Sequence, residues 1–138
     1  MKKAFRIIMM LALVAILSAC GNGNNSAPSD NNQGSASIIG KWKGVRMTEN
    51  GVFDEGGTEY LQEFSWEFNE DGTAQGFVDD VEFGKPAPYT LEGDQLTIKG
   101  GGMAASSVYT VTTLTKKKLV LEQVIGGDTQ TEEFERVK

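Results

Sequence analysis

The sequence predicts an all-β fold in which about eight antiparallel strands form a small up-and-down barrel. Short runs of alternating polar and apolar residues fill the chain from residue 38 to its end, and turn residues separate them. No segment of this part has the apolar spacing of a convincing amphipathic helix. Hairpin-connected strands leave no exposed edge when they close into a barrel, and a two-sheet sandwich is the alternative.

The second expected strand, LQEFSWEF (Leu61–Phe68), shows the alternation most clearly, because its three aromatic residues fall on one face. The turn NEDG follows it, and turns containing Gly or Pro separate most of the later strands. A looser segment containing Gly84, Pro86 and Pro88 is expected before the fourth strand, and a glycine-rich loop at 100–107 after the fifth. The other expected strands are Ile38–Thr48, Thr73–Asp79, Tyr89–Leu91, Gln95–Lys99, Val108–Leu114, Leu119–Val124 and Thr129–Val137.

The inward face of the barrel has two interpretations. An eight-stranded barrel is just wide enough either to be filled by its own side chains or to hold one small ligand. The small size of the domain favours a filled core, whereas the aromatic face of the second strand favours a ligand-lined interior. In that second case, the expected ligand-binding residues are Phe64, Trp66, Phe68, Leu96, Ile98 and Val111.

The N-terminus has the three parts of a secretory signal peptide. MKKAFR carries three positive charges, an unbroken apolar run covers Ile7–Leu17, and two small residues precede Cys20. The apolar run is shorter than the roughly 20 residues that a membrane-spanning helix needs. We therefore expect residues 1–19 to be a cleaved signal.

The stretch LSAC, which ends at Cys20, resembles the lipobox of bacterial lipoproteins. This resemblance implies cleavage before Cys20 and attachment of lipid, such as palmitate, to this residue as a membrane anchor. The tract from Cys20 to residue 37 has no aromatic or large aliphatic side chain and predicts a disordered linker. Residues 38–138 then form the barrel domain in the cell envelope, on a membrane and a face that the sequence leaves open.

Charge and composition exclude several functions. Removing the expected signal leaves ten basic and 19 acidic side chains, a net charge of −9, which disfavours nucleic acid as a partner. The chain has no histidine, the commonest general base and a common metal ligand. Residues 67–72 begin like a calcium-binding loop, but Val78 stands where its bidentate acid belongs. We therefore expect no enzyme, no catalytic residue, no cofactor and no metal site.

The motif GKW, which ends at Trp42, resembles the G-x-W motif at the first strand of the lipocalins. In that family the tryptophan closes the base of the barrel, and a basic residue near the last strand lies over it. The resemblance therefore implies a structural role in barrel closure for Trp42 and Arg136. Further stretches resemble hairpins of the small lipocalin-like domains of bacterial lipoproteins, namely FNEDGT (68–73), YTLEGDQLTI (89–98) and KKLVLE (117–122).

These observations predict a lipid-anchored protein of the bacterial cell envelope with a lipocalin-like barrel that binds a small apolar or amphipathic ligand. The alternative is a solid barrel that binds or inhibits another envelope or secreted protein through its outer surface. In that case, two long loops, Thr48–Tyr60 and Asp79–Pro88, are the expected contact sites.

Overall fold

The computed structural model describes residues 36–100 and 105–138. The expected signal peptide 1–19, the lipidation site Cys20 and nearly all of the expected linker lie outside these residues. Part of the expected glycine-rich loop, residues 101–104, also lies outside them. The barrel belongs to the compact unit Asn32–Lys138.

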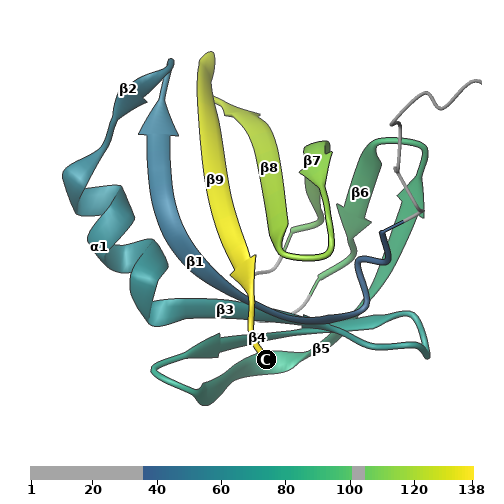
Figure 1. Cartoon of the computed structure of the whole chain (residues 1–138). Helices are drawn as coiled ribbons and strands as arrows, with labels where there is room; N and C mark the ends of the chain where they lie inside the picture. Colours follow the sequence, from purple (N-terminus) through teal and green to yellow (C-terminus); the bar gives the residue numbers. More distant parts are fainter. Residues whose placement is uncertain (1–35, 101–104) are drawn as a thin grey trace, which may run out of the picture. The chain divides into compact units, whose positions relative to one another are not determined.

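Eight antiparallel strands form a closed ring, as the sequence predicts (Figure 1). Each strand of the ring pairs with the next ring strand along the chain, and β1 also pairs with β9, which closes the barrel and excludes an open two-sheet sandwich. The two-residue strand β2 pairs only with the end of β1 in the described sheet. The elements are β1 (Gly40–Glu49), β2 (Val52–Phe53), α1 (Glu55–Glu63), β3 (Phe64–Phe68), β4 (Thr73–Val78), β5 (Val81–Glu92), β6 (Gln95–Ile98), β7 (Ser107–Leu114), β8 (Lys118–Ile125) and β9 (Asp128–Arg136).

Helix α1 contradicts the expectation that the domain has no helix. The helix replaces the second half of the expected loop Thr48–Tyr60 and the first three residues of the expected second strand. Asp54 caps it, because its carboxylate accepts a hydrogen bond of 3.0 Å from the Gly57 amide. The helix buries Thr58 and Leu61 beside β1. The helix lies beside the part of β1 that no longer pairs with β3, since these two strands pair only through Gly40–Lys43 of β1.

Strand β5 contradicts the expected loose segment around its glycine and prolines. Its twelve residues include almost all of the expected loop Asp79–Pro88. The pairing with β4 shifts register between Ala74 and Gly76, which places Pro86 in an irregular part of the ladder. The pairing with β6 begins only at Tyr89. A proline is compatible with such a strand, because neither ladder requires its missing amide hydrogen there.

One end of the barrel is closed by packed side chains. The Arg136 guanidinium lies 4.1 Å from the centre of the Trp42 ring, close enough for a cation–π contact. Arg136 also donates hydrogen bonds to the carbonyl oxygens of Ser37, Ile39 and Lys116 at 2.6, 2.6 and 2.9 Å. It therefore connects the segment before β1, the β7–β8 turn and β9. The fully buried large apolar side chains are Trp42, Phe68, Phe134, Leu96, Ile98, Leu119 and Leu121.

Candidate ligand-binding cavity

The other end of the barrel interior is not filled, although the size of the domain favours a filled core. A cavity of about 500 Å³ lies between the strands and α1. Along β1 and β9 its lining residues Met47, Gln130 and Glu132 lie toward the opposite end from Trp42 and Arg136. Cavities of about 300–1,000 Å³ are typical of small-molecule sites. The barrel therefore has room for one small ligand.

An aromatic wall forms one side of the cavity. Phe64 and Trp66 of β3 line it, with their rings 5.1 Å apart in an edge-to-face arrangement. Trp66 in turn lies 6.0 Å from Phe68, and Phe68 lies 5.0 Å from Tyr89. These contacts continue the aromatic wall into the packed core, because the Phe68 side chain is fully buried.

The expected ligand-binding residues are divided between the cavity and the core. Phe64, Trp66 and Ile98 line the cavity. Phe68 and Leu96 are buried in the hydrophobic core and are not among the lining residues of the described chain. Val111 is half-buried and packs against that core without lining the cavity. The structure therefore brings three of the six predicted residues together around the cavity and places the other three in or against the packed core.

A polar row, comprising Tyr109, Gln123, Gln130 and Glu132, faces the cavity from β7, β8 and β9. The Gln123 side-chain amide donates to Gln130 at 3.2 Å and to Glu132 at 3.5 Å. Glu132 is 9% exposed, and its burial raises the pKa of the carboxyl group to about 7. Burial, followed by the nearby Glu132 charge, raises the pKa of Tyr109 to about 12.

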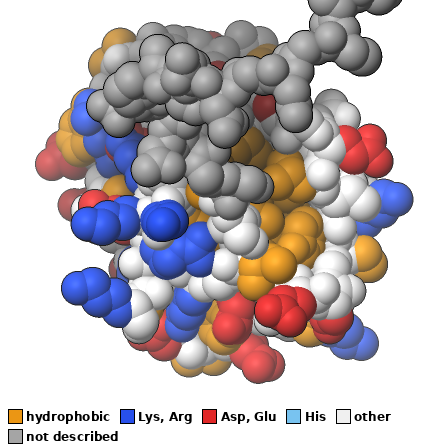
Figure 2. Space-filling view, turned by 45° about the vertical axis from the view of Figure 1, so that its right-hand side comes forward, with side chains coloured by type: hydrophobic (Ala, Val, Ile, Leu, Met, Phe, Trp, Pro, Cys, Tyr) orange, Lys and Arg blue, Asp and Glu red, His pale blue; other side chains and the backbone are white. Residues whose placement is uncertain are grey.

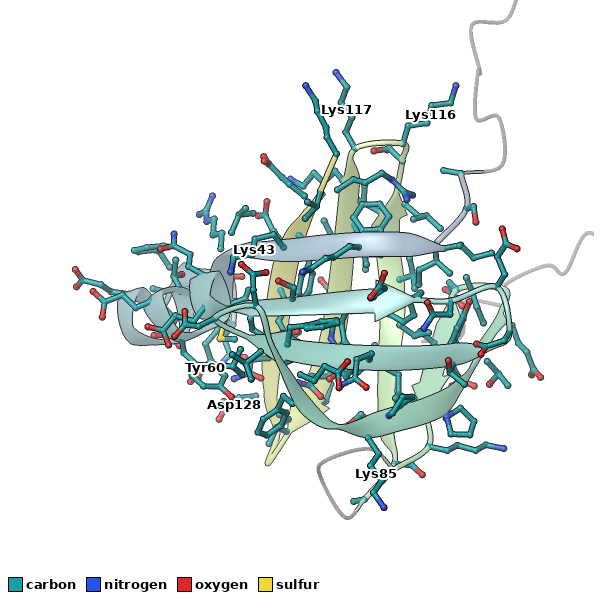
Figure 3. The ribbon with its side chains drawn as sticks, turned by 90° about the horizontal axis from the view of Figure 1, so that it is seen from below. Lys43, Tyr60, Lys85, Lys116, Lys117 and Asp128 are labelled. Atoms are coloured by element: carbon teal, nitrogen blue, oxygen red, sulfur yellow. The ribbon has the colours of Figure 1, made fainter. Side chains whose placement is uncertain are left out.

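Side chains from α1, β5 and β8 border the cavity. They include Tyr60 on α1, Phe83 and Lys85 on β5, and Ile125 on β8. Tyr60, Phe83 and Ile125 are unusually exposed for large apolar or aromatic residues. Figure 2 shows hydrophobic side chains gathered in one patch on a face of the molecule, bordered by charged side chains. Lys85 is exposed, and its side chain extends away from the other strands (Figure 3).

The acidic residues that follow β4 have surface positions. Asp79, Asp80 and Glu82 are all exposed, and Asp80 forms an ion pair of 2.9 Å with Lys41. Across residues 36–100 and 105–138, no group of three or more Cys, Asp or Glu side chains could hold a metal ion. The same part of the chain contains no helix long and apolar enough to cross a membrane.

The polar row is absent from the set of site residues that the sequence predicts. Its signal lies in the alternation of β9, where Gln130 and Glu132 share a face with Phe134 and Arg136. Because Phe134 is fully buried, this face points inward, and Glu132 must therefore point inward too. The predicted set contains only aromatic and aliphatic residues, so it omits this carboxyl group.

Comparisons with known proteins agree with this geometry. The sequence model of a family described as "Lipocalin-like domain" matches residues 38–121. A crystal structure of an uncharacterized protein from Bacteroides eggerthii is similar, with a TM-score of 0.54 and 16% sequence identity. The similar region covers 73% of this chain and 100% of that one, and it shows a shared fold. No curated protein matches the chain.

Proposed function

Because the chain belongs to the lipocalin-like domain family, we propose that it binds a small apolar or amphipathic molecule in the cavity of its barrel. The observation that carries this proposal is the cavity of about 500 Å³, with Phe64 and Trp66 on its wall. Each Å² of apolar surface that a ligand buries there contributes about 25 cal/mol. The aromatic wall therefore provides the driving force, and the polar row provides selectivity.

The alternative, a solid barrel that binds another protein through long loops, has less support. Its first premise was a filled interior, and the barrel contains a cavity. Its second premise was two long loops, and these segments form β2 and most of α1 and β5. We therefore favour binding inside the barrel over binding on its outer surface.

We also propose that the barrel works at a membrane of the bacterial envelope. The support is the sequence alone, namely the signal-like residues 1–19 and the lipobox-like LSAC that ends at Cys20. A lipid anchor would hold the cavity close to a source of amphipathic molecules. The protein then acts as a carrier or sensor of such molecules and not as an enzyme.

A titration of residues 32–138 with N-phenylnaphthylamine, an apolar dye that fluoresces in dry surroundings, tests ligand binding. This segment contains the complete ring of strands, so it holds every strand pair that the fold needs. We expect saturable binding to one site. Ala87→Met places a longer side chain in the cavity lining and should weaken binding by roughly tenfold, the effect of about 1.4 kcal/mol.

Thr90→Met is the matched control, because Thr90 lies on the same strand but its side chain is exposed. It should leave the affinity for the dye unchanged. Native mass spectrometry of the same protein, purified from cells without detergent, should detect a retained small molecule. The proposal is wrong if the folded wild-type protein shows neither saturable dye binding nor a retained molecule.

A further inference from the structure

The position of Glu132 distinguishes this cavity from a purely apolar one. This residue lines the cavity and is 9% exposed. Within the part of the chain that the structure describes, no lysine or arginine forms an ion pair with it. A carboxyl group buried without a cation is costly, because low-dielectric surroundings destabilise its charged form. Such a group inside a binding cavity therefore favours a ligand that supplies a partner for the charge.

The hydrogen bonds of Glu132 leave room for such a ligand. Among the described residues, its carboxylate accepts one long side-chain hydrogen bond of 3.5 Å, from Gln123. An ionised carboxylate offers about four acceptor positions. Gln123 also donates to Gln130 at 3.2 Å, so its amide is shared between two acceptors. The free acceptor capacity of Glu132 matches a ligand group that carries several hydrogen-bond donors.

The charges around the cavity favour a cation. The charged residues that line it in the described chain are Asp54, Glu132 and Lys85. Asp54 is engaged in capping α1, and Lys85 is exposed and extends away from the other strands (Figure 3). Besides these three groups, the titratable lining residues of the described chain are Tyr60 and Tyr109. Neither tyrosine supplies a positive charge.

Apolar groups provide the rest of the binding surface. Phe64, Trp66 and Ile98 line the same cavity as Glu132. We propose that the ligand is a cationic amphiphile with a primary amine, an inference that rests on the proposed ligand-binding function. Its ammonium group binds Glu132 inside the barrel, and its apolar chain packs against the aromatic wall. An anionic amphiphile is disfavoured, because it would place two carboxylates in one desolvated site.

Three probes with the same chain and different head groups test this inference, namely decylamine, decanol and decanoic acid. Each displaces N-phenylnaphthylamine from residues 32–138 at pH 8, where decylamine is a cation. A charge-assisted hydrogen bond is stronger than a neutral one, so decylamine should bind roughly tenfold more tightly than decanol, or better. Decanoic acid should bind more weakly than decanol.

Glu132→Gln keeps the shape of the side chain and removes its charge. It should abolish the preference for decylamine over decanol while leaving the binding of decanol nearly unchanged. Glu135→Gln is the control, because Glu135 lies on the same strand and is exposed. That variant should keep the preference for the amine.

The outcomes separate this inference from the proposed function. If all three probes bind equally, or if Glu132→Gln keeps the preference for the amine, the cavity binds amphiphiles without recognising a cation and the inference is overturned. If decanoic acid binds most tightly, the inference is overturned as well. If none of the probes displaces the dye and the dye itself does not bind, the proposed function fails together with the inference.

Discussion

At the scale of single residues, Glu132 lowers the stability of the empty barrel. Its carboxyl group is almost fully buried among polar but uncharged side chains, Tyr109, Gln123 and Gln130. Gln123 donates only a long hydrogen bond to it, and burial raises its pKa to about 7. A residue that weakens the fold in this way is expected at a binding site, where strain on the free protein favours the bound state.

The buried carboxyl group predicts a pH-dependent stability. The pKa of Glu132 rises from 4.5 to about 7 on folding, so between these pH values the folded protein holds a proton that the unfolded chain has lost. The free energy of unfolding should therefore fall as the pH rises through this window, by up to roughly 3 kcal/mol. Urea unfolding of wild-type protein and Glu132→Gln at pH 5 and pH 8 measures this effect, and the variant should lack it.

Other shifted groups titrate outside this window. The pKa of Asp71 is lowered by its hydrogen bond from the Thr73 side chain, and that of Asp80 by its hydrogen bond from Lys41. These exposed groups change the stability in the opposite sense and only in more acidic solution. Glu135→Gln is again the control and should keep the wild-type dependence on pH. Parallel pH profiles for wild type and Glu132→Gln would contradict the buried position of the charge.

Sequence alternation assigns a residue to a face but not to a depth along the barrel axis. Phe64, Trp66 and Phe68 share the inward face of β3, as predicted, yet Phe68 lies in the packed core. The β7–β8 ladder shifts register between Val111 and Thr113, and Val111 likewise packs against the core. Depth depends on the tilt and stagger of neighbouring strands, which the sequence of one strand does not contain.

At the scale of elements, α1 was missed because its local signals are weak. It contains Gly56 and Gly57, both poor helix formers, and its buried residues are Thr58 and Leu61. Tertiary contacts stabilise the helix. Thr58 donates a hydrogen bond to the Met47 carbonyl oxygen through its hydroxyl and accepts one from the Met47 amide at 2.9 Å. Because neighbouring elements stabilise this helix, its own sequence needs only a weak helical periodicity of apolar residues.

The packing of α1 on β1 predicts opposite effects for two glycine substitutions. A Cβ atom at Gly44 would clash with the backbone carbonyl of Leu61, so Gly44→Ala must displace the helix. Overpacking of this kind costs about 1–3 kcal/mol of unfolding free energy. A Cβ atom at Gly56 would make only an ordinary contact, because the nearest atom, in Asp54, lies 3.9 Å from it. Gly56→Ala should therefore stabilise the helix by up to about 1 kcal/mol, since alanine has a higher helix propensity than glycine.

Urea unfolding and hydrogen exchange of the α1 amides measure these two effects. Faster exchange is expected in Gly44→Ala and slower exchange in Gly56→Ala. Since α1 borders the cavity through Tyr60 and Leu61, Gly44→Ala should also weaken dye binding. Equal stability of Gly44→Ala and wild type would mean that α1 does not rest directly on β1.

At the scale of the whole molecule, the order of the eight ring strands follows from the series of short strands and turns that the sequence predicts. Their closure follows from the advantage of leaving no edge. The cavity does not follow in the same way. Its shape depends on the register shifts between Gly44 and Arg46 and between Ala74 and Gly76, and on α1 lying between β1 and β3. These features act together over the whole ring, so the interior volume could not be inferred from the strands one at a time.

The proposed anchor also belongs to this scale, because it decides where the whole barrel works. Cys20 is the one cysteine of the full sequence and follows the lipobox-like residues LSA. In bacteria that express the full chain and grow with radiolabelled palmitate, the wild-type protein should take up label and sediment with membranes. Cys20→Ser should lose both the label and the membrane association, because no second thiol can accept the lipid. Ser26→Ala, six residues further along the expected linker, should keep both. An unlabelled wild-type protein in the soluble fraction would remove the membrane from the proposed function and leave ligand binding by the barrel to stand by itself.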